Sequence, residues 1–163
     1  MRWALAVTAV TTVLLLWFRR HYTAVTVRGL SMQPTLHDGD RVLVRRIPPA
    51  RLHVGDVVVA RPDRLGIGGD RWLVKRVAAL PGDPVPESVG GRVDRTAVPD
   101  GALVLLGDNA EASWDSRTLG LFDVLLLLGR VEGTLSRSPV SRAAGLLYGP
   151  DLASNRAGEP PRS

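Results

Sequence analysis

The sequence of 163 residues contains no cysteine, which excludes disulfide bonds, zinc–thiolate sites and thiol nucleophiles. Lysine is almost absent too, because Lys75 is the single lysine among 21 basic residues and all the others are arginine. Aromatic residues make up 5% of the chain and none is interleaved with a basic run, so the pattern with which proteins read nucleic-acid bases is missing. We therefore expect no nucleic-acid partner, and attribute the net charge of +5 to arginine usage or, secondarily, to affinity for a membrane surface.

A long apolar run occurs only near the amino terminus, where residues 3–18 carry no charge and are flanked by Arg2 and by Arg19 and Arg20. This length of helix rises about 24 Å, slightly less than the ~30 Å hydrocarbon core, and interfacial tryptophans and arginines can extend the span. We predict one transmembrane helix within residues 1–22. A cleaved signal peptide and a buried core helix are the alternatives, but no small-x-small site follows directly and the apolar residues form no single stripe.

Residues 23–135 have the pattern of an all-β domain, in which short runs of β-branched and aliphatic residues are separated by turns. These runs are residues 24–28, 41–45, 56–60, 71–80, 102–106 and 124–132. Gly-Asp dipeptides lie at or near the ends of the runs, at residues 39–40, 55–56, 69–70, 82–83 and 107–108. Glycine there supplies a positive φ and aspartate caps the turn. We predict a sheet-rich sandwich or partly open barrel, with a helix at residues 124–128 as a local alternative.

Two segments show no clear strand pattern. Residues 84–106 are too few for a large second β-domain and hold a hairpin or two at most. From residue 136 to residue 163 the chain is dominated by serine, arginine, glycine and proline, with one apolar spot at residues 145–148. We predict that this carboxy-terminal tail is mobile.

Ser31 lies between an apolar lead-in and a run of turn residues, and a serine nucleophile needs a base. Three histidines, at positions 21, 37 and 53, are candidates, although each follows a strand-like run or turn next to solvated residues. Lys75 has different neighbours, because in a strand it shares a face with Leu73 and Val77. Burial among aliphatic side chains disfavours the ammonium form and lowers the pKa of a lysine from about 10.4 towards the 7–8 that a general base needs.

A lysine that snorkels from a strand edge is the alternative interpretation of Lys75. The use of arginine at every other basic position favours the general base, because arginine does not lose its proton in a protein and lysine can.

The motifs of residues 31–117 resemble, in order, the sequence boxes of type I signal peptidases. They are Ser31-Met-Gln-Pro-Thr-Leu36, a weaker Val54-Gly-Asp-Val-Val-Val59, Lys75-Arg-Val77 with Pro81-Gly-Asp83, and Gly107-Asp-Asn109 with Ser113-Trp-Asp-Ser-Arg117. The resemblance spans about residues 25–131. A lone Ser-Met-x-Pro-Thr would only be suggestive, whereas several boxes in the right order are specific.

The resemblance implies a serine endopeptidase of the cell membrane that removes amino-terminal signal peptides from exported proteins after small-x-small motifs. It implies a single-pass anchor, a catalytic domain of signal-peptidase-like fold at residues 23–135 on the extracytoplasmic face, and no metal or organic cofactor. Its implied partners are preprotein signal peptides and the lipid bilayer.

The resemblance also implies roles for individual residues, with Ser31 as the nucleophile and Lys75 as the general base. The hydroxyl of Ser113 would orient the lysine amine, while Asp115 turns towards Arg117. The supporting residues it implies are Met32, Arg76, Gly107, Asp108, Asn109, Ser113, Asp115 and Arg117. Without the resemblance, the Asp115 and Arg117 pair reads equally well as a surface ion pair, and Ser113 as a turn serine.

Two features depart from the expected pattern. Some members of the family carry an oxyanion-binding serine two residues before the nucleophile, where this chain has Gly29, so the backbone N–H of Ser31 is the expected donor and the second donor is open. The positive-inside rule applied to Arg19 and Arg20 would place the domain in the cytoplasm, opposite to the side that the activity requires.

Three functional alternatives stay open: a dedicated maturation protease for one or few secreted proteins, a self-cleaving SOS-type repressor, and a catalytically inactive membrane-anchored binding protein. The apolar run and the lack of a helix-turn-helix pattern disfavour the repressor.

Overall fold

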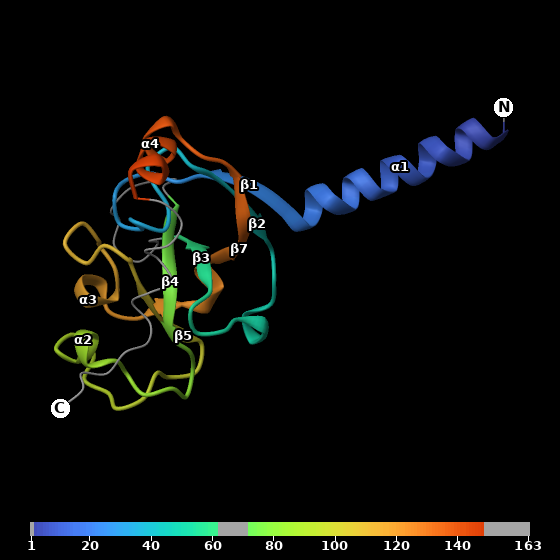
Figure 1. Ribbon diagram of the computed structural model, residues 1–163. Coiled ribbons are helices and arrows are strands. Elements are labelled where there is room, and N and C mark those ends of the chain that lie inside the picture. Colours follow the sequence, from blue (N-terminus) through green and yellow to red (C-terminus); the bar gives the residue numbers. More distant parts are fainter. Residues whose placement is uncertain (1, 62–71, 149–163) are drawn as a thin grey trace, which may run out of the picture.

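The computed structural model describes residues 2–61 and 72–148 (Figure 1). The predicted Gly69-Asp70 turn, the first residue of the predicted strand 71–80 and the final part of the predicted tail lie outside these residues. The elements are, in chain order, α1 (Arg2–His21), β1 (Tyr22–Thr26), β2 (Arg41–Arg45), η1 (Pro49–Arg51), β3 (Val57–Ala60), β4 (Leu73–Ala79), α2 (Glu87–Gly90), β5 (Ala102–Leu106), α3 (Ser116–Leu119), β6 (Phe122–Asp123), η2 (Val124–Leu126), β7 (Leu127–Ser136) and α4 (Pro139–Tyr148).

The described strands form one antiparallel sheet in the order β1-β2-β7-β3-β4-β5-β6. The long strand β7 pairs with both β2 and β3, so it joins the amino-terminal strands to the rest of the sheet. The prediction of an all-β, sheet-rich domain is confirmed. The local alternative at residues 124–128 is partly realised, because η2 ends at Leu126 and β7 begins at the next residue.

The core consists of three clusters of buried aliphatic side chains along the sheet, and the first of them holds the segment that carries Ser31. Met32 and Leu36 belong to this cluster and are 1% and 6% exposed. The burial of these two side chains fixes the segment between β1 and β2 against the sheet, because apolar groups leave water at a gain of roughly 25 cal/mol per Å². The other buried members are Val25, Val27, Val42, Val44, Val59 and Val74.

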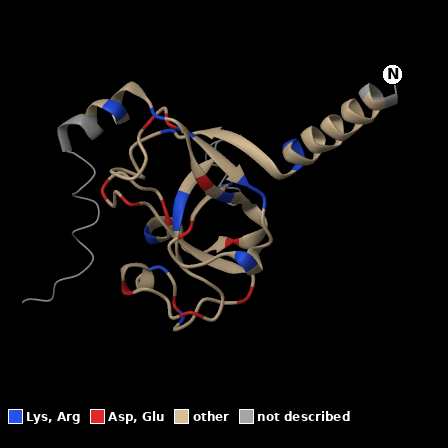
Figure 2. Cartoon of the chain, turned by 45° about the vertical axis from the view of Figure 1, so that its right-hand side comes forward, with Lys and Arg blue, Asp and Glu red and all other residues tan. Residues whose placement is uncertain are grey.

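Helix α1 projects away from the sheet, and Figure 2 shows basic residues at its domain-proximal end. These residues, Arg19, Arg20 and His21, lie in its last turn, where positive charge complements the helix dipole. The side chain of Trp3 and the large apolar side chains from Val7 to Phe18 are exposed. Within residues 2–61 and 72–148, however, no helix combines the length and the apolarity needed to cross a membrane. A helix is therefore present where one was expected, and its role as an anchor stays a prediction.

The structure differs from expectation at the start of the predicted tail. Strand β7 continues to Ser136, and α4 begins at Pro139. Ser138 and Ser141 are buried, at 8% and 1% exposure, so this part of the chain packs on the domain. The composition of the segment did not reveal this packing, because the contact partner, Asp40, lies almost a hundred residues earlier.

Candidate active site

Ser31 lies on a loop of residues 27–40 that connects β1 to β2, here called the Ser31 loop. Its base is closed by the backbone, where the N–H of Val27 donates to the carbonyl of Asp40 at 2.8 Å. Its middle is held by the buried side chain of Met32. The loop therefore presents Ser31, which is half-buried, at a defined position beside the sheet.

Lys75 lies on β4, and its Nζ donates to Ser31 Oγ at 2.7 Å. The lysine is 2% exposed. Burial lowers the pKa of Lys75 to about 8, and the charge of Arg117 acts in the same direction, while Asp115 and Asp108 oppose it. Burial is the largest of these effects because removal of water penalises the ammonium form more than the nearby carboxylates stabilise it. A hydroxyl and a readily deprotonated amine thus meet in a site shielded from water.

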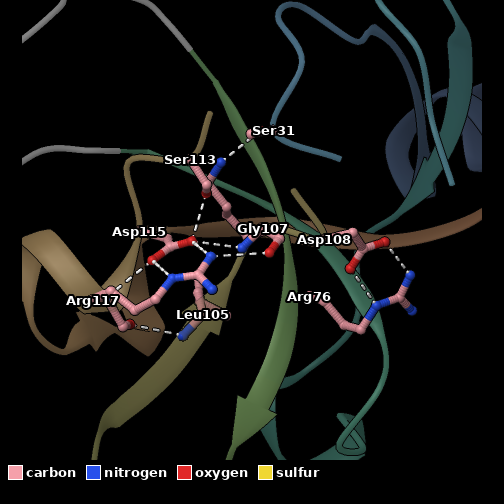
Figure 3. Close-up of polar contacts among 10 residues, drawn as sticks. Ser31, Arg76, Leu105, Gly107, Asp108, Ser113, Asp115 and Arg117 are labelled. Atoms are coloured by element: carbon pink, nitrogen blue, oxygen red, sulfur yellow. Dashed lines mark hydrogen bonds and ion pairs between the residues drawn. The ribbon is translucent and has the colours of Figure 1, made fainter. Parts of the chain in front are cut away.

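Asp115 joins Gly107, Ser113 and Arg117 into one wall of this site, as Figure 3 shows. The side chain is 0% exposed and accepts hydrogen bonds from the Gly107 N–H at 2.8 Å, the Ser113 hydroxyl at 2.5 Å and the Arg117 guanidinium at 2.5 Å. Burial alone would raise the pKa of Asp115, but these hydrogen bonds outweigh it and hold the pKa below its usual range. The carboxylate stays charged, as a fixed acceptor that joins three segments.

The turn at Gly107 approaches Ser31 closely. The N–H of Asn109 donates to the Ser31 carbonyl at 3.0 Å. A Cβ at Gly107 would lie 2.6 Å from that carbonyl oxygen and in conflict with the Ser113 side chain. Only glycine therefore fits at this position, which explains its place in the Gly107-Asp-Asn109 motif.

A second ion pair joins β4, the Gly107 turn and the Ser31 loop. Arg76 donates to both carboxylate oxygens of Asp108, at 2.8 and 2.7 Å, and also to the Gly55 carbonyl at 2.8 Å. The Thr35 hydroxyl donates to the same Asp108 at 2.5 Å. Burial would raise the pKa of Asp108, but the bonds from Arg76 and Thr35 lower it overall. The bidentate geometry fixes the turn relative to the strand that carries Lys75.

The structure places the catalytic and supporting residues implied by the resemblance around Ser31 and Lys75, but it pairs one of them differently. The Ser113 hydroxyl was expected to orient the Lys75 amine, and it donates instead to Asp115. The charged acceptor is the stronger one for a hydroxyl, and Lys75 meets the Ser31 hydroxyl. The orienting role of Ser113 therefore stays a prediction.

Sequence reasoning missed two polar residues of the site. Thr35 had a signal, since it lies within the Ser31-Met-Gln-Pro-Thr-Leu36 motif. Ser116 also lies within a motif, but nothing in the sequence distinguishes it from an ordinary turn serine. Its Oγ accepts from the Leu105 N–H at 2.9 Å, which ties α3 to β5. In the described part of the chain no histidine is hydrogen-bonded to Ser31, and no group of three or more His, Asp or Glu side chains could hold a metal ion.

Comparison with known proteins gives a consistent result. A family model described as "Signal peptidase, peptidase S26" matches residues 1–93 and 86–135. A signal peptidase IB of Staphylococcus aureus is 28% identical over 171 aligned positions, which cover 81% of this chain and 87% of that protein. A signal peptidase I of Bacillus caldolyticus is 29% identical over 165 positions, which cover 80% of this chain and 86% of that protein.

Proposed function

Since the chain belongs to the signal peptidase family, peptidase S26, we propose that it is a serine endopeptidase that cleaves signal peptides from exported preproteins after small-x-small motifs. The observation that carries the proposal is the 2.7 Å contact between Ser31 Oγ and the buried Nζ of Lys75. The matched proteins named signal peptidase support the substrate class.

In the proposed reaction, neutral Lys75 removes the proton of Ser31 as Oγ attacks the scissile carbonyl. The backbone N–H of Ser31 makes no hydrogen bond to another described residue, so it is free to donate to the oxyanion of the tetrahedral intermediate. Lys75, now an ammonium, returns its proton to the leaving amine, and the signal-peptide segment stays bound to Oγ as an acyl-enzyme. A water molecule, deprotonated by Lys75, then attacks the acyl carbon, and Lys75 passes the proton to Oγ as the bond to the signal peptide breaks, which restores the serine.

Asp115 and Asp108 do not react in this cycle but hold the segments around the reacting groups in place. Each carboxylate is paired with a guanidinium, Asp115 with Arg117 and Asp108 with Arg76. Pairing directs their charge away from Lys75, which matters because an unpaired carboxylate at this distance would stabilise the ammonium and raise its pKa. We assign both pairs a positioning role.

The pH dependence of cleavage tests the proposal directly. The purified full chain in detergent is expected to cleave a preprotein with an Ala-x-Ala site, at a rate that rises with pH through about 8 and then levels off, because only deprotonated Lys75 acts as base. The measurement is kcat/KM between pH 5 and 10, with the cleavage site read by mass spectrometry. A rate limb centred below about 7 would point to a histidine base. No cleavage of several preproteins would favour a dedicated maturation protease or an inactive binding protein.

We further propose that α1 anchors the protein in the membrane with the β-domain on the extracytoplasmic face, where signal peptides emerge. The exposed apolar side chains of α1 support the anchor. In cells whose extracytoplasmic face is accessible and whose cytoplasmic membrane is intact, added protease is expected to digest the β-domain. A cytoplasmic protein that stays undigested is the control. Digestion only after the membrane is lysed would reverse the orientation and contradict the export role.

A further inference from the structure

Three Gly-Asp turns of this fold share one geometry. In each, the carboxylate of the aspartate accepts a hydrogen bond from the backbone N–H three residues earlier, and the aspartate N–H donates back to the carbonyl of that residue. The pairs are His37 with Asp40 at 3.1 Å, His53 with Asp56 at 2.9 Å, and Leu80 with Asp83 at 2.8 Å. This local bond accounts for the recurrence of the dipeptide as a turn signal.

Asp40 makes one contact that the other two turns lack. Its second carboxylate oxygen accepts the N–H of Ser138 at 2.6 Å, across 98 residues of sequence. Asp40 is 1% exposed, whereas Asp56 and Asp83 are only half-buried. A buried carboxylate needs hydrogen bonds to offset the loss of water, and one of the bonds that satisfies Asp40 therefore comes from the carboxy-terminal part of the chain.

Ser138 directly precedes helix α4 and connects its first turn to Asp40 of the Ser31 loop. The Ser138 Oγ caps the helix by accepting from the Ser141 N–H at 3.2 Å. The two backbones meet closely, because a Cβ at Gly39 would lie 3.2 Å from the Ser138 Cβ. Figure 1 shows α4 beside the loop that precedes β2.

We propose that Asp40 is a positioning residue and that α4 clamps the base of the Ser31 loop through it, which keeps Ser31 within reach of Lys75. The proposal rests on the proposed function for its effect on rate. The loop is tethered at its tip by the Asn109 N–H on the Ser31 carbonyl, and at its base by Asp40. Loss of the bond from Ser138 removes one restraint on the base and lets the loop shift, and a displacement of about 1 Å can reduce catalysis on the order of a hundredfold.

The test compares Asp40→Asn with Asp83→Asn. Both substitutions place an amide N–H₂ where a carboxylate accepts in a Gly-Asp turn, but only the first also faces Ser138 of α4. For Asp40→Asn we expect kcat to fall about 30-fold with KM within about twofold of wild type. The acidic limb of the pH profile is expected to stay in place, because the groups that set the Lys75 pKa are untouched. Asp83→Asn is expected to keep kcat within about 1.5-fold of wild type.

Amide hydrogen exchange supplies a readout that needs no activity. In Asp40→Asn the amides of Val27, Gly39 and Arg142 are expected to exchange faster than in wild type, and in Asp83→Asn they are not. Equal effects of the two substitutions on rate and exchange would reduce Asp40 to an ordinary turn residue and overturn the clamp. If wild type cleaves nothing but the exchange pattern holds, the proposed function fails and the clamp stands as a structural contact.

If Asp40→Asn does not fold, Ser138→Ala is tested instead. It removes only the Oγ that caps α4 and keeps the backbone N–H of residue 138 that donates to Asp40. It is expected to speed exchange at the start of α4 and to lower kcat about threefold. An unchanged kcat together with faster exchange in α4 would contradict a link between this helix and the Ser31 loop.

Discussion

Replacement of Lys75 by methionine is expected to abolish cleavage and at the same time to stabilise the folded protein at neutral pH. The loss of activity follows from removal of the proposed base, and we expect kcat to fall by about 10³-fold or more, as is typical for residues of a catalytic unit. Methionine has a similar length and fills the same apolar space without a charge.

The gain in stability follows from the pKa of the buried amine. Folding lowers the pKa of Lys75 from 10.5 to about 8, so the folded state binds this proton less tightly than the unfolded state. The resulting penalty is fully present below about pH 8 and disappears as the pH rises towards 10.5. At ~1.4 kcal/mol per pKa unit, the methionine variant gains up to about 3 kcal/mol at pH 7. Urea unfolding of wild type and variant at pH 7 and pH 10 measures it, and the difference is expected to shrink at the higher pH.

Ser31→Ala is the matched control for this prediction. It removes the other half of the 2.7 Å contact, so it is expected to lose activity to a similar extent but to leave the stability within about 1 kcal/mol of wild type. Cleavage by Lys75→Met at the wild-type rate would exclude Lys75 as the base. A loss of stability in the same variant would show that the ammonium is not penalised by burial.

The face pattern of β4 and the use of arginine at every other basic position together made Lys75 predictable, whereas the partner of Ser113 was not predictable. Alternation places Lys75 among aliphatic neighbours from sequence alone, and the structure buries it as expected. The hydroxyl of Ser113 was expected to meet the Lys75 amine, and it donates instead to Asp115, the buried residue that caps α3. Such a choice between neighbouring polar groups is made by tertiary packing, which residue spacing does not encode.

The strands were predictable where local pattern and sheet position agree, as at β2 and β5, whose bounds match the predicted runs. Strand β6 was missed because two residues carry no periodicity. Helix α4 was missed for another reason, since its composition resembles a solvated tail and its packing depends on Asp40, far away in sequence. Long-range polar contacts of this kind are visible only once the chain is folded.

The second large effect is expected at Asp115, where truncation to alanine should destabilise the fold by about 3–5 kcal/mol. The side chain is 0% exposed and receives donors from Gly107, Ser113 and Arg117. Its removal leaves the buried Ser113 hydroxyl and the Gly107 N–H without their acceptor, and leaves the half-buried Arg117 with the Gly107 carbonyl but without its ion partner. Chemical unfolding measures the change in the free energy of unfolding. Asp94→Ala, at an exposed position, is the control and is expected to stay within about 0.5 kcal/mol of wild type.

A double substitution separates two contributions to the loss of stability, the lost hydrogen bonds of Asp115 and the charge of Arg117 left without its partner. If the unpaired Arg117 causes most of the damage, Asp115→Ala combined with Arg117→Ala should be more stable than Asp115→Ala alone. Equal or lower stability of the double variant would assign the effect to Gly107 and Ser113 instead.

Asp115 also acts on the chemistry, because its charge raises the pKa of Lys75 against the stronger effect of burial. Asp115→Asn, which keeps the shape of the side chain, is therefore expected to move the acidic limb of the pH profile to lower pH in whatever fraction folds. A limb that moves upward would mean that Asp115 disfavours the ammonium, contrary to its charge. The same carboxylate would thus fix the wall of the site and keep the pKa of the base from falling further, while its pairing with Arg117 limits how far it raises that pKa.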